Sequence, residues 1–148
     1  MEVERFIEPD LPLVSVDENL IADCVQNLLN NAAKYASSGG WVRVSAETAP
    51  HPDGARVRIA VQDRGPGISA DDLPHIFDPF YRSEAVRNSQ IPGVGLGLSL
   101  VKRIVESLHG TVEVKSSAAT PGASFILYLP AQPAAPVLTE MEIKEVAS

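Results

Sequence analysis

Two glycine-rich stretches carry the residues best suited to holding a nucleotide. The first, Asp63-Arg64-Gly65-Pro66-Gly67, places a carboxylate ahead of two glycines. The second, Gly93-Val94-Gly95-Leu96-Gly97-Leu98, places three alternating glycines directly before a helical pattern. Glycines leave backbone N–H groups unshielded and a helix N-terminus favours anions, so the second stretch can hold phosphate. It is not a Walker A loop, because no Gly-Lys-Ser/Thr follows, and Leu98 replaces the third glycine of the dinucleotide fingerprint.

Asp63 has the sharpest chemical role of any single residue. A carboxylate accepts a hydrogen bond from the exocyclic amine of adenine, and guanine offers no such donor at that position. Gly65 and Gly67 let the chain turn and the base approach. The same pattern is also typical of an ordinary turn at a strand end, because Asp and Gly are common turn residues. The second glycine stretch downstream favours the adenine site.

An amide pair upstream supplies candidate ligands for a metal ion. Asn27 and Asn31 are four residues apart, so they share one helix face, with Lys34 on the same arc. Mg²⁺ prefers oxygen ligands and keeps several waters, so two amide oxygens can complement the oxygens of a triphosphate. Lys34 can reach a phosphate as a flexible point charge. A solvated polar face is the alternative, and Tyr35 either flanks the nucleotide or belongs to the core.

Residues 77–92 combine weak periodicity with prolines and arginines. We expect a long functional loop, since loops of this length in compact domains usually have a function. Arg82 and Arg87 can close over phosphates, although a loop arginine is more often solvated. The aromatic residues between Phe77 and Tyr81 form either core or a surface for a partner.

Hydrophobic periodicity predicts the elements that position these residues. Asp17 is an N-cap for a helix to about Tyr35, whose packing face comprises Ile21, Val25, Leu28, Leu29 and Ala32. A later helix from Gly97 has its apolar face at Leu98, Val101, Ile104, Val105 and Leu108. Alternation predicts strands at 3–7 and 13–16, a hairpin of 41–47 with 57–61, and a hairpin of 111–115 with 123–129. Residues 69–73 are expected to begin a short helix.

Composition bounds the class of protein. The chain has 148 residues, 45% hydrophobic and 21% charged, which is enough for one domain with a core. Its formal net charge of −7 argues against a nucleic-acid partner, whereas a few local cations suffice for ATP. Cys24 is the single cysteine, so we expect no disulfide framework and a small packing residue instead.

No apolar run approaches the roughly 20 residues of a membrane span, and the N-terminus is acidic where a signal peptide is basic. We therefore expect a cytoplasmic chain without membrane contact of its own, whose parent protein can still be membrane-anchored. The abrupt start in strand-like sequence indicates a piece of something longer.

Four segments resemble, in order, the sequence boxes of the ATP-binding catalytic (HATPase_c) domain of bacterial sensor histidine kinases. This family lies in the GHKL superfamily with DNA gyrase B, MutL and the Hsp-type chaperone. Residues 27–35 resemble its N box, 63–68 its first glycine box, 76–82 its F box and 93–98 its second glycine box. The resemblance covers nearly all of residues 3–130.

The resemblance implies an α/β two-layer sandwich, the Bergerat fold, with a mixed, mainly antiparallel sheet backed by about three helices. This domain would occupy residues 1–130, and a Pro/Ala linker and tail would follow at 131–148. Residues near 78–95 would form an ATP lid. Catalytic roles are implied for Asn27, Asn31 and Lys34, of which the two asparagines would hold Mg²⁺. Nucleotide contacts are implied for Asn31, Lys34, Tyr35, Asp63, Gly65, Gly67, Ile68, Arg82, Gly93, Gly95, Leu96, Gly97 and Leu98.

The implied reaction moves the γ-phosphoryl group of ATP to a histidine on a separate dimerisation domain of the same parent kinase, for relay to a response regulator. The acceptor motif, a helical histidine followed by an acidic residue, is missing, so we expect a catalytic module without its own acceptor. Hydrolases of the superfamily carry a glutamate base where this chain has Asn27, which predicts weak ATPase activity. The alternatives are a GHKL ATPase, a Ser/Thr-directed relative such as an anti-sigma-factor kinase, and an ATP-binding interaction module without catalysis.

Overall fold

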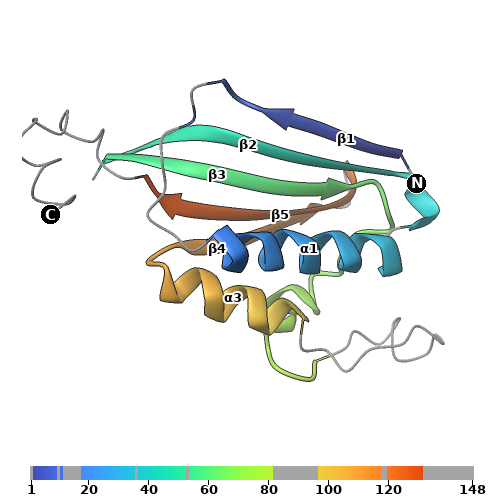
Figure 1. The fold of residues 1–148 in the computed structure, drawn as a ribbon. Helices are drawn as coiled ribbons and strands as arrows, with labels where there is room; N and C mark the ends of the chain where they lie inside the picture. The colour runs from blue at the N-terminus through green and yellow to red at the C-terminus, as the bar shows by residue number, and fades with distance from the viewer. Residues whose placement is uncertain are drawn as a thin grey trace, which may run out of the picture.

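The computed structural model describes residues 2–9, 11, 18–35, 37–52, 54–81, 97–117 and 120–131, which form two layers. One layer is a five-stranded sheet and the other consists of two α-helices on a single face of it (Figure 1). The strands are β1 (Glu2–Ile7), β2 (Trp41–His51), β3 (Gly54–Asp63), β4 (Thr111–Ser117) and β5 (Thr120–Pro130). Their order across the sheet is β1-β2-β3-β5-β4.

The sheet is mixed and mainly antiparallel, as predicted. β1 pairs with β2 in parallel, and the β2–β3, β3–β5 and β4–β5 pairs are antiparallel. Both predicted hairpins are confirmed, with strands that run longer than the alternating patterns indicated. The predicted strand at 13–16 and the N-cap at Asp17 lie outside the described residues.

The helices are α1 (Glu18–Tyr35) and α3 (Gly97–Ser107), with 3₁₀ turns η1 (Ser37–Gly39) and η2 (Leu73–His75). Within the described ranges there are thus two α-helices, where the resemblance implied about three. The short helix expected from 69–73 takes the form of η2. Pro74 has no N–H to donate, and the His75 N–H bonds the Asp72 carbonyl three residues back, which is the tight 3₁₀ pattern.

The core lies between the helices and the sheet. Its buried members from α1 are Cys24, Leu28 and Ala32, and those from α3 are Val101 and Val105. The sheet contributes Val42, Val61, Ala123, Phe125, Leu127 and Leu129. The packing role predicted for Cys24 is therefore confirmed, and the two helices pack on each other as well as on the strands.

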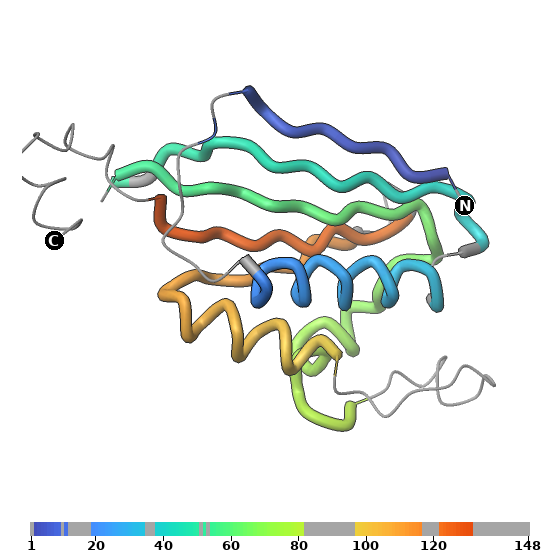
Figure 2. The backbone as a smooth tube through the Cα atoms, viewed as in Figure 1, coloured from blue at the N-terminus to red at the C-terminus, as the bar shows by residue number. Residues whose placement is uncertain are grey.

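The end of β3, the later part of α1 and the start of α3 lie near one another in the fold. β3 ends at Asp63, and the chain from 64 to 81 then runs past the C-terminal part of α1 toward the first turn of α3 (Figure 2). α3 runs antiparallel to α1 (Figure 1), so its first residues lie beside the later part of α1. No helix within the described ranges combines the length and the apolar character that crossing a bilayer requires.

Candidate functional site

Asp63 lies at the end of β3 with its carboxylate held in a fixed orientation. The residue is only 6% exposed. Its Oδ1 accepts hydrogen bonds from the N–H of Gly65 at 2.9 Å and from the N–H of Ala123 at 3.2 Å. Within the described part of the chain no hydrogen bond uses Oδ2. One oxygen is therefore anchored by the backbone, and the other is available to accept a bond from a ligand.

Three glycines let separate backbone segments close around Asp63. A Cβ on Gly122 would lie 2.0 Å from the Asp63 carbonyl oxygen, and a Cβ on Gly39 would lie 2.3 Å from the Arg64 carbonyl oxygen. Gly67 has φ +79°, in the left-handed region that favours glycine. Because real Cβ atoms cannot approach backbone oxygens this closely, the three segments reach their positions only with glycine at these places.

A serine on β4 joins this loop to β5. The Ile68 N–H donates to the Ser116 Oγ at 2.9 Å, and this hydroxyl donates to the Gly122 carbonyl at 3.0 Å. Sequence reasoning missed Ser116, Gly122 and Ala123. The Pro121-Gly122 dipeptide is a turn signal that points to Gly122, but nothing in the alternating pattern of β4 distinguishes Ser116.

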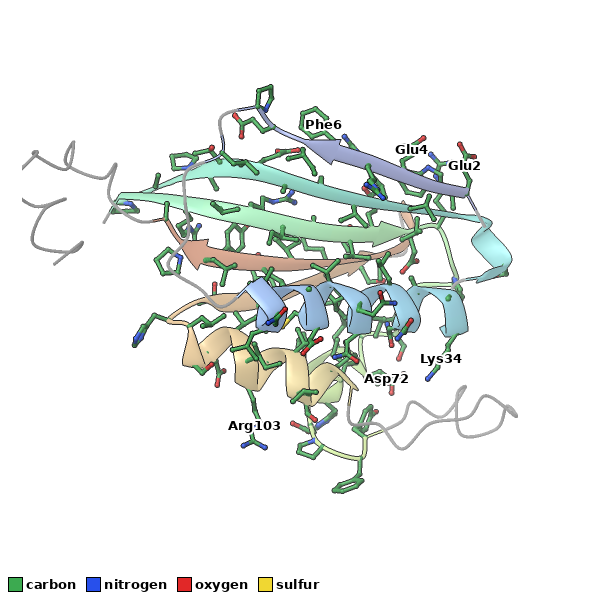
Figure 3. All side chains as sticks on the ribbon, in the orientation of Figure 1. Glu2, Glu4, Phe6, Lys34, Asp72 and Arg103 are labelled. Atoms are coloured by element: carbon green, nitrogen blue, oxygen red, sulfur yellow. The ribbon has the colours of Figure 1, made fainter. Side chains whose placement is uncertain are left out.

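Asn27 and Asn31 lie half-buried on one face of α1, as predicted, and Lys34 lies exposed on the same arc. The neighbouring amides differ, because Gln26 Nε2 donates to Asn30 Oδ1 at 3.0 Å. In the described ranges, neither Asn27 nor Asn31 makes a side-chain hydrogen bond. Figure 3 shows Lys34 at the end of α1, projecting away from the sheet. The helix thus presents two amides and one ammonium group that no other described side chain engages.

Gly97 brings the second glycine stretch to this face of α1. A Cβ on Gly97 would lie 3.9 Å from Asn27 Oδ1. The first turn of α3, whose N–H groups have no intrahelical acceptor, therefore begins beside the Asn27 amide. Leu98 is half-buried and packs against the core. Residues far apart in the sequence are in contact here, which local patterns predicted only as separate parts.

Part of the predicted site falls outside the described part of the chain. Arg82, Gly93, Gly95 and Leu96 lie outside the described residues, as does the side chain of Tyr35. Arg87 and most of the expected lid fall in the same gap. Their assigned roles stay predictions.

The segment after the first glycine box is fixed by its own polar side chains. Ser69 Oγ donates to Asp72 Oδ2 at 2.7 Å, and the Tyr81 hydroxyl donates to Asp72 Oδ1. Phe77 packs edge-on against Phe125, with ring centroids 6.4 Å apart, whereas Phe80 is 70% exposed at φ 65°. The sequence left open whether these aromatic residues form core or surface. Phe77 belongs to the core, and Phe80 belongs to the surface.

Cys24 has an unreactive thiol. Burial, and secondarily the negative charge of Asp23, raise the pKa of its thiol to about 11. The thiol therefore stays protonated at neutral pH and offers no thiolate nucleophile.

Comparison with known proteins gives this site its family. The profile of the family "Histidine kinase-, DNA gyrase B-, and HSP90-like ATPase" matches residues 16–133. The sensor histidine kinase AtsR of Burkholderia thailandensis is 38% identical over 128 residues, which are 86% of this chain and 21% of that protein. The chain thus spans about a fifth of this relative.

Solved structures of histidine kinases resemble the fold. The mycobacterial sensor histidine kinase MprB superposes with a TM-score of 0.72 at 30% identity, over 89% of this chain and 83% of that one. Full-length ShkA in complex with AMPPNP superposes with a TM-score of 0.73 at 31% identity, over 92% of this chain and 27% of that one. This chain therefore belongs to the family of histidine kinase-, DNA gyrase B- and HSP90-like ATPases, as an ATP-binding domain of the sensor histidine kinase type.

Proposed function

We propose that this chain is the catalytic domain of a two-component sensor histidine kinase, and that it transfers the γ-phosphoryl group of ATP to a histidine on a separate dimerisation domain of its parent. The phosphoryl group then passes to a response regulator. The observation that carries the proposal is the side chain at position 27. The Asn27 amide lies beside the start of α3, and an amide cannot take a proton from water.

Adenine recognition is assigned to Asp63. Its Oδ2 accepts a hydrogen bond from the exocyclic amine, while the bonds from Gly65 and Ala123 hold Oδ1 still. A preset acceptor loses little conformational freedom when the base arrives, which favours affinity. That full-length ShkA was solved with AMPPNP, an analogue of ATP, supports the choice of nucleotide.

Mg²⁺ is assigned to Asn27 and Asn31, and the phosphates to Lys34 and the first turn of α3. The two amides fit a hard cation because both supply oxygen and neither is engaged by another described side chain. When bound, the ion neutralises charge on the phosphate oxygens. Lys34 adds a mobile positive charge, and the N–H groups that open α3 add oriented dipoles.

The chemical step balances without a base from this chain. The lone pair of a neutral imidazole nitrogen on the acceptor attacks the γ-phosphorus, and an N–P bond forms. The bond from that phosphorus to the β–γ bridging oxygen breaks, and its electron pair leaves with ADP. The attacking nitrogen carries no proton, so nothing has to be abstracted before the attack. Asn27 therefore suits transfer to histidine better than attack by water, which needs a base.

We assign contact with the histidine-bearing domain to the apolar side chains that the core leaves out beside this site. Phe80 is 70% exposed, and Leu100, in the first turn of α3, is 45% exposed. Lys102 of α3 lies over the Phe77 ring, with its Nζ 6.0 Å from the centroid, so α3 and the aromatic segment are neighbours. We place the reaction in the cytoplasm, where ATP is available.

The test mixes this chain with the separately prepared histidine-bearing domain of the parent and γ-labelled ATP. We expect acid-labile, base-stable label on that domain, dependent on Mg²⁺, with little free phosphate. An acceptor domain whose histidine is replaced by Gln is the matched control and should stay unlabelled. Rapid hydrolysis abolished by Asn27→Ala would instead identify a GHKL ATPase. ATP binding with neither transfer nor hydrolysis would identify an ATP-binding interaction module.

A further inference from the structure

Ser116 bridges two backbone segments that flank Asp63. Its hydroxyl accepts from the Ile68 N–H at 2.9 Å and donates to the Gly122 carbonyl at 3.0 Å, so both hydrogen-bonding functions of one Oγ are used. The first segment follows the glycine loop after β3, and the second lies in β5 between Thr120 and Ala123, which both pair with β4. Among the described residues, the β3–β5 pairing ends at Gln62 and Ser124, and no strand pairing includes Ile68.

The strand around Ser116 is irregular at this point. Ser116 pairs with Ala123 in the β4–β5 ladder, and the register shifts between Ser116 and Ser117. A β-bulge re-aims the side chains beside it. Ala123, the ladder partner of Ser116, donates its N–H to Asp63 Oδ1. The two paired residues thus serve the same loop, one through its side chain and the other through its backbone.

The glycine loop is built to receive this hydroxyl. A Cβ on Gly67 would lie 2.8 Å from Ser116 Oγ and 3.2 Å from the Gly122 carbonyl oxygen. Gly67 also has φ +79°. A larger residue at position 67 would meet both a backbone penalty and the serine, so the close approach of the loop to β4 depends on glycine and serine together.

We propose that Ser116 is a positioning residue for adenine recognition, which acts by tying the turn at Gly67 and Ile68 to β5. This inference rests on the proposed function, since it assumes that Asp63 binds the base. Without the hydroxyl, the Ile68 N–H and the Gly122 carbonyl both lose their partner. The turn is then free to shift relative to the Ala123 N–H that orients Asp63, and the preset acceptor becomes less well defined.

Ser116→Thr and Ser116→Val make a pair of nearly equal shape that differs in the hydroxyl alone. We expect Ser116→Val to bind AMP about five- to tenfold more weakly than Ser116→Thr, the usual effect of a lost hydrogen bond. Ser107→Ala is the control for an ordinary lost hydroxyl, because Ser107 Oγ donates to the Ile104 carbonyl at the exposed C-terminal end of α3. It should bind AMP as the wild type does. Ser116→Ala repeats the test with the smaller side chain if the branched ones disturb folding.

The readout is calorimetric titration with AMP without Mg²⁺ and with ATP in its presence. Because Ser116 acts where the adenine base binds, the affinity for AMP and the affinity for ATP should fall by the same factor. In the transfer reaction, the KM for ATP should rise while kcat stays unchanged. Equal AMP binding by Ser116→Val and Ser116→Thr, or a loss confined to Mg²⁺-ATP, would overturn the positioning role alone. Failure of the wild type to bind AMP or ATP would overturn the proposed function, and this inference with it.

Discussion

Replacing Asp63 by Asn changes one oxygen into an NH₂ group and leaves the shape of the side chain almost intact. The anchored Oδ1 accepts from two backbone N–H groups, so the carbonyl oxygen of the new amide must stay on that side to avoid facing two donors. The NH₂ group is then directed to where we place the exocyclic amine of adenine. Two donors meet, and the hydrogen bond between carboxylate and amine is lost.

The expected cost follows from the kind of bond removed. A hydrogen bond to a charged group contributes about 1.5–3 kcal/mol. The lower to middle part of that range corresponds to roughly 10- to 40-fold weaker binding of ATP. Inosine triphosphate carries a carbonyl where ATP carries the amine, and this carbonyl accepts from an amide NH₂. The Asp63→Asn variant should therefore lose its preference for ATP over inosine triphosphate.

Calorimetric titration of the wild type and the variant with both nucleotides gives the four dissociation constants. Asp71→Asn is the matched control, since it makes the same charge change on an exposed residue of the following segment. Thermal melts establish that each variant is folded. If Asp63→Asn bound ATP within threefold of the wild type, or if Asp71→Asn lost as much, the assigned role of Asp63 would be refuted.

Further predictions concern the metal site, the backbone around Asp63 and the buried Cys24. Asn31→Ala should weaken Mg²⁺-dependent ATP binding and leave AMP binding without the ion unchanged, which titration of both ligands checks; an equal loss for AMP would contradict the metal role. Gly122→Ala should lower the melting temperature by about 10 °C, because its Cβ would meet the Asp63 carbonyl at 2.0 Å as well as an unfavourable φ of +99°; Gly40→Ala, with φ +67° and open space, should cost much less. Cys24 should resist a thiol reagent at pH 8 until the chain unfolds, because burial raises its pKa to about 11. Between the usual 9.0 and that value only the unfolded chain ionises the thiol, so the free energy of unfolding should fall as the pH rises through this range.

The local parts of the fold could be predicted because each has a short-range cause. A helical stripe from Ile21 to Ala32 must be buried, and alternation in residues 41–47 can bury one face only as a strand. The two hairpins follow because their strands are close in sequence. The short helix expected from 69–73 forms only as the 3₁₀ turn at 73–75, because Pro74 and a hydrogen bond three residues back decide its type within a single turn.

The residues of the site could likewise be recognised from the sequence, whereas their arrangement could not. Asp63, the glycine stretches and the amide pair occur in an order that few structures other than a nucleotide site require. Their mutual positions depend on contacts that no local pattern encodes. Ile68 and Ser116, which form a hydrogen bond, are 48 residues apart in the sequence, and Asp63 and Ala123 are 60 residues apart. A serine in an alternating strand has no signal that marks it for such a contact.

The sequence by itself determined the chemistry available to this protein: a carboxylate that can read an amine, amides that can face a cation, and glycines that open the backbone. Tertiary structure alone decided which oxygen of Asp63 is anchored and which residues of β4 and β5 support it. It also decided that α3 begins, at Gly97, beside Asn27. The reason is physical. Residue type fixes donors and acceptors, whereas their directions are fixed by strand order, and the order β1-β2-β3-β5-β4 arises from packing over the whole chain.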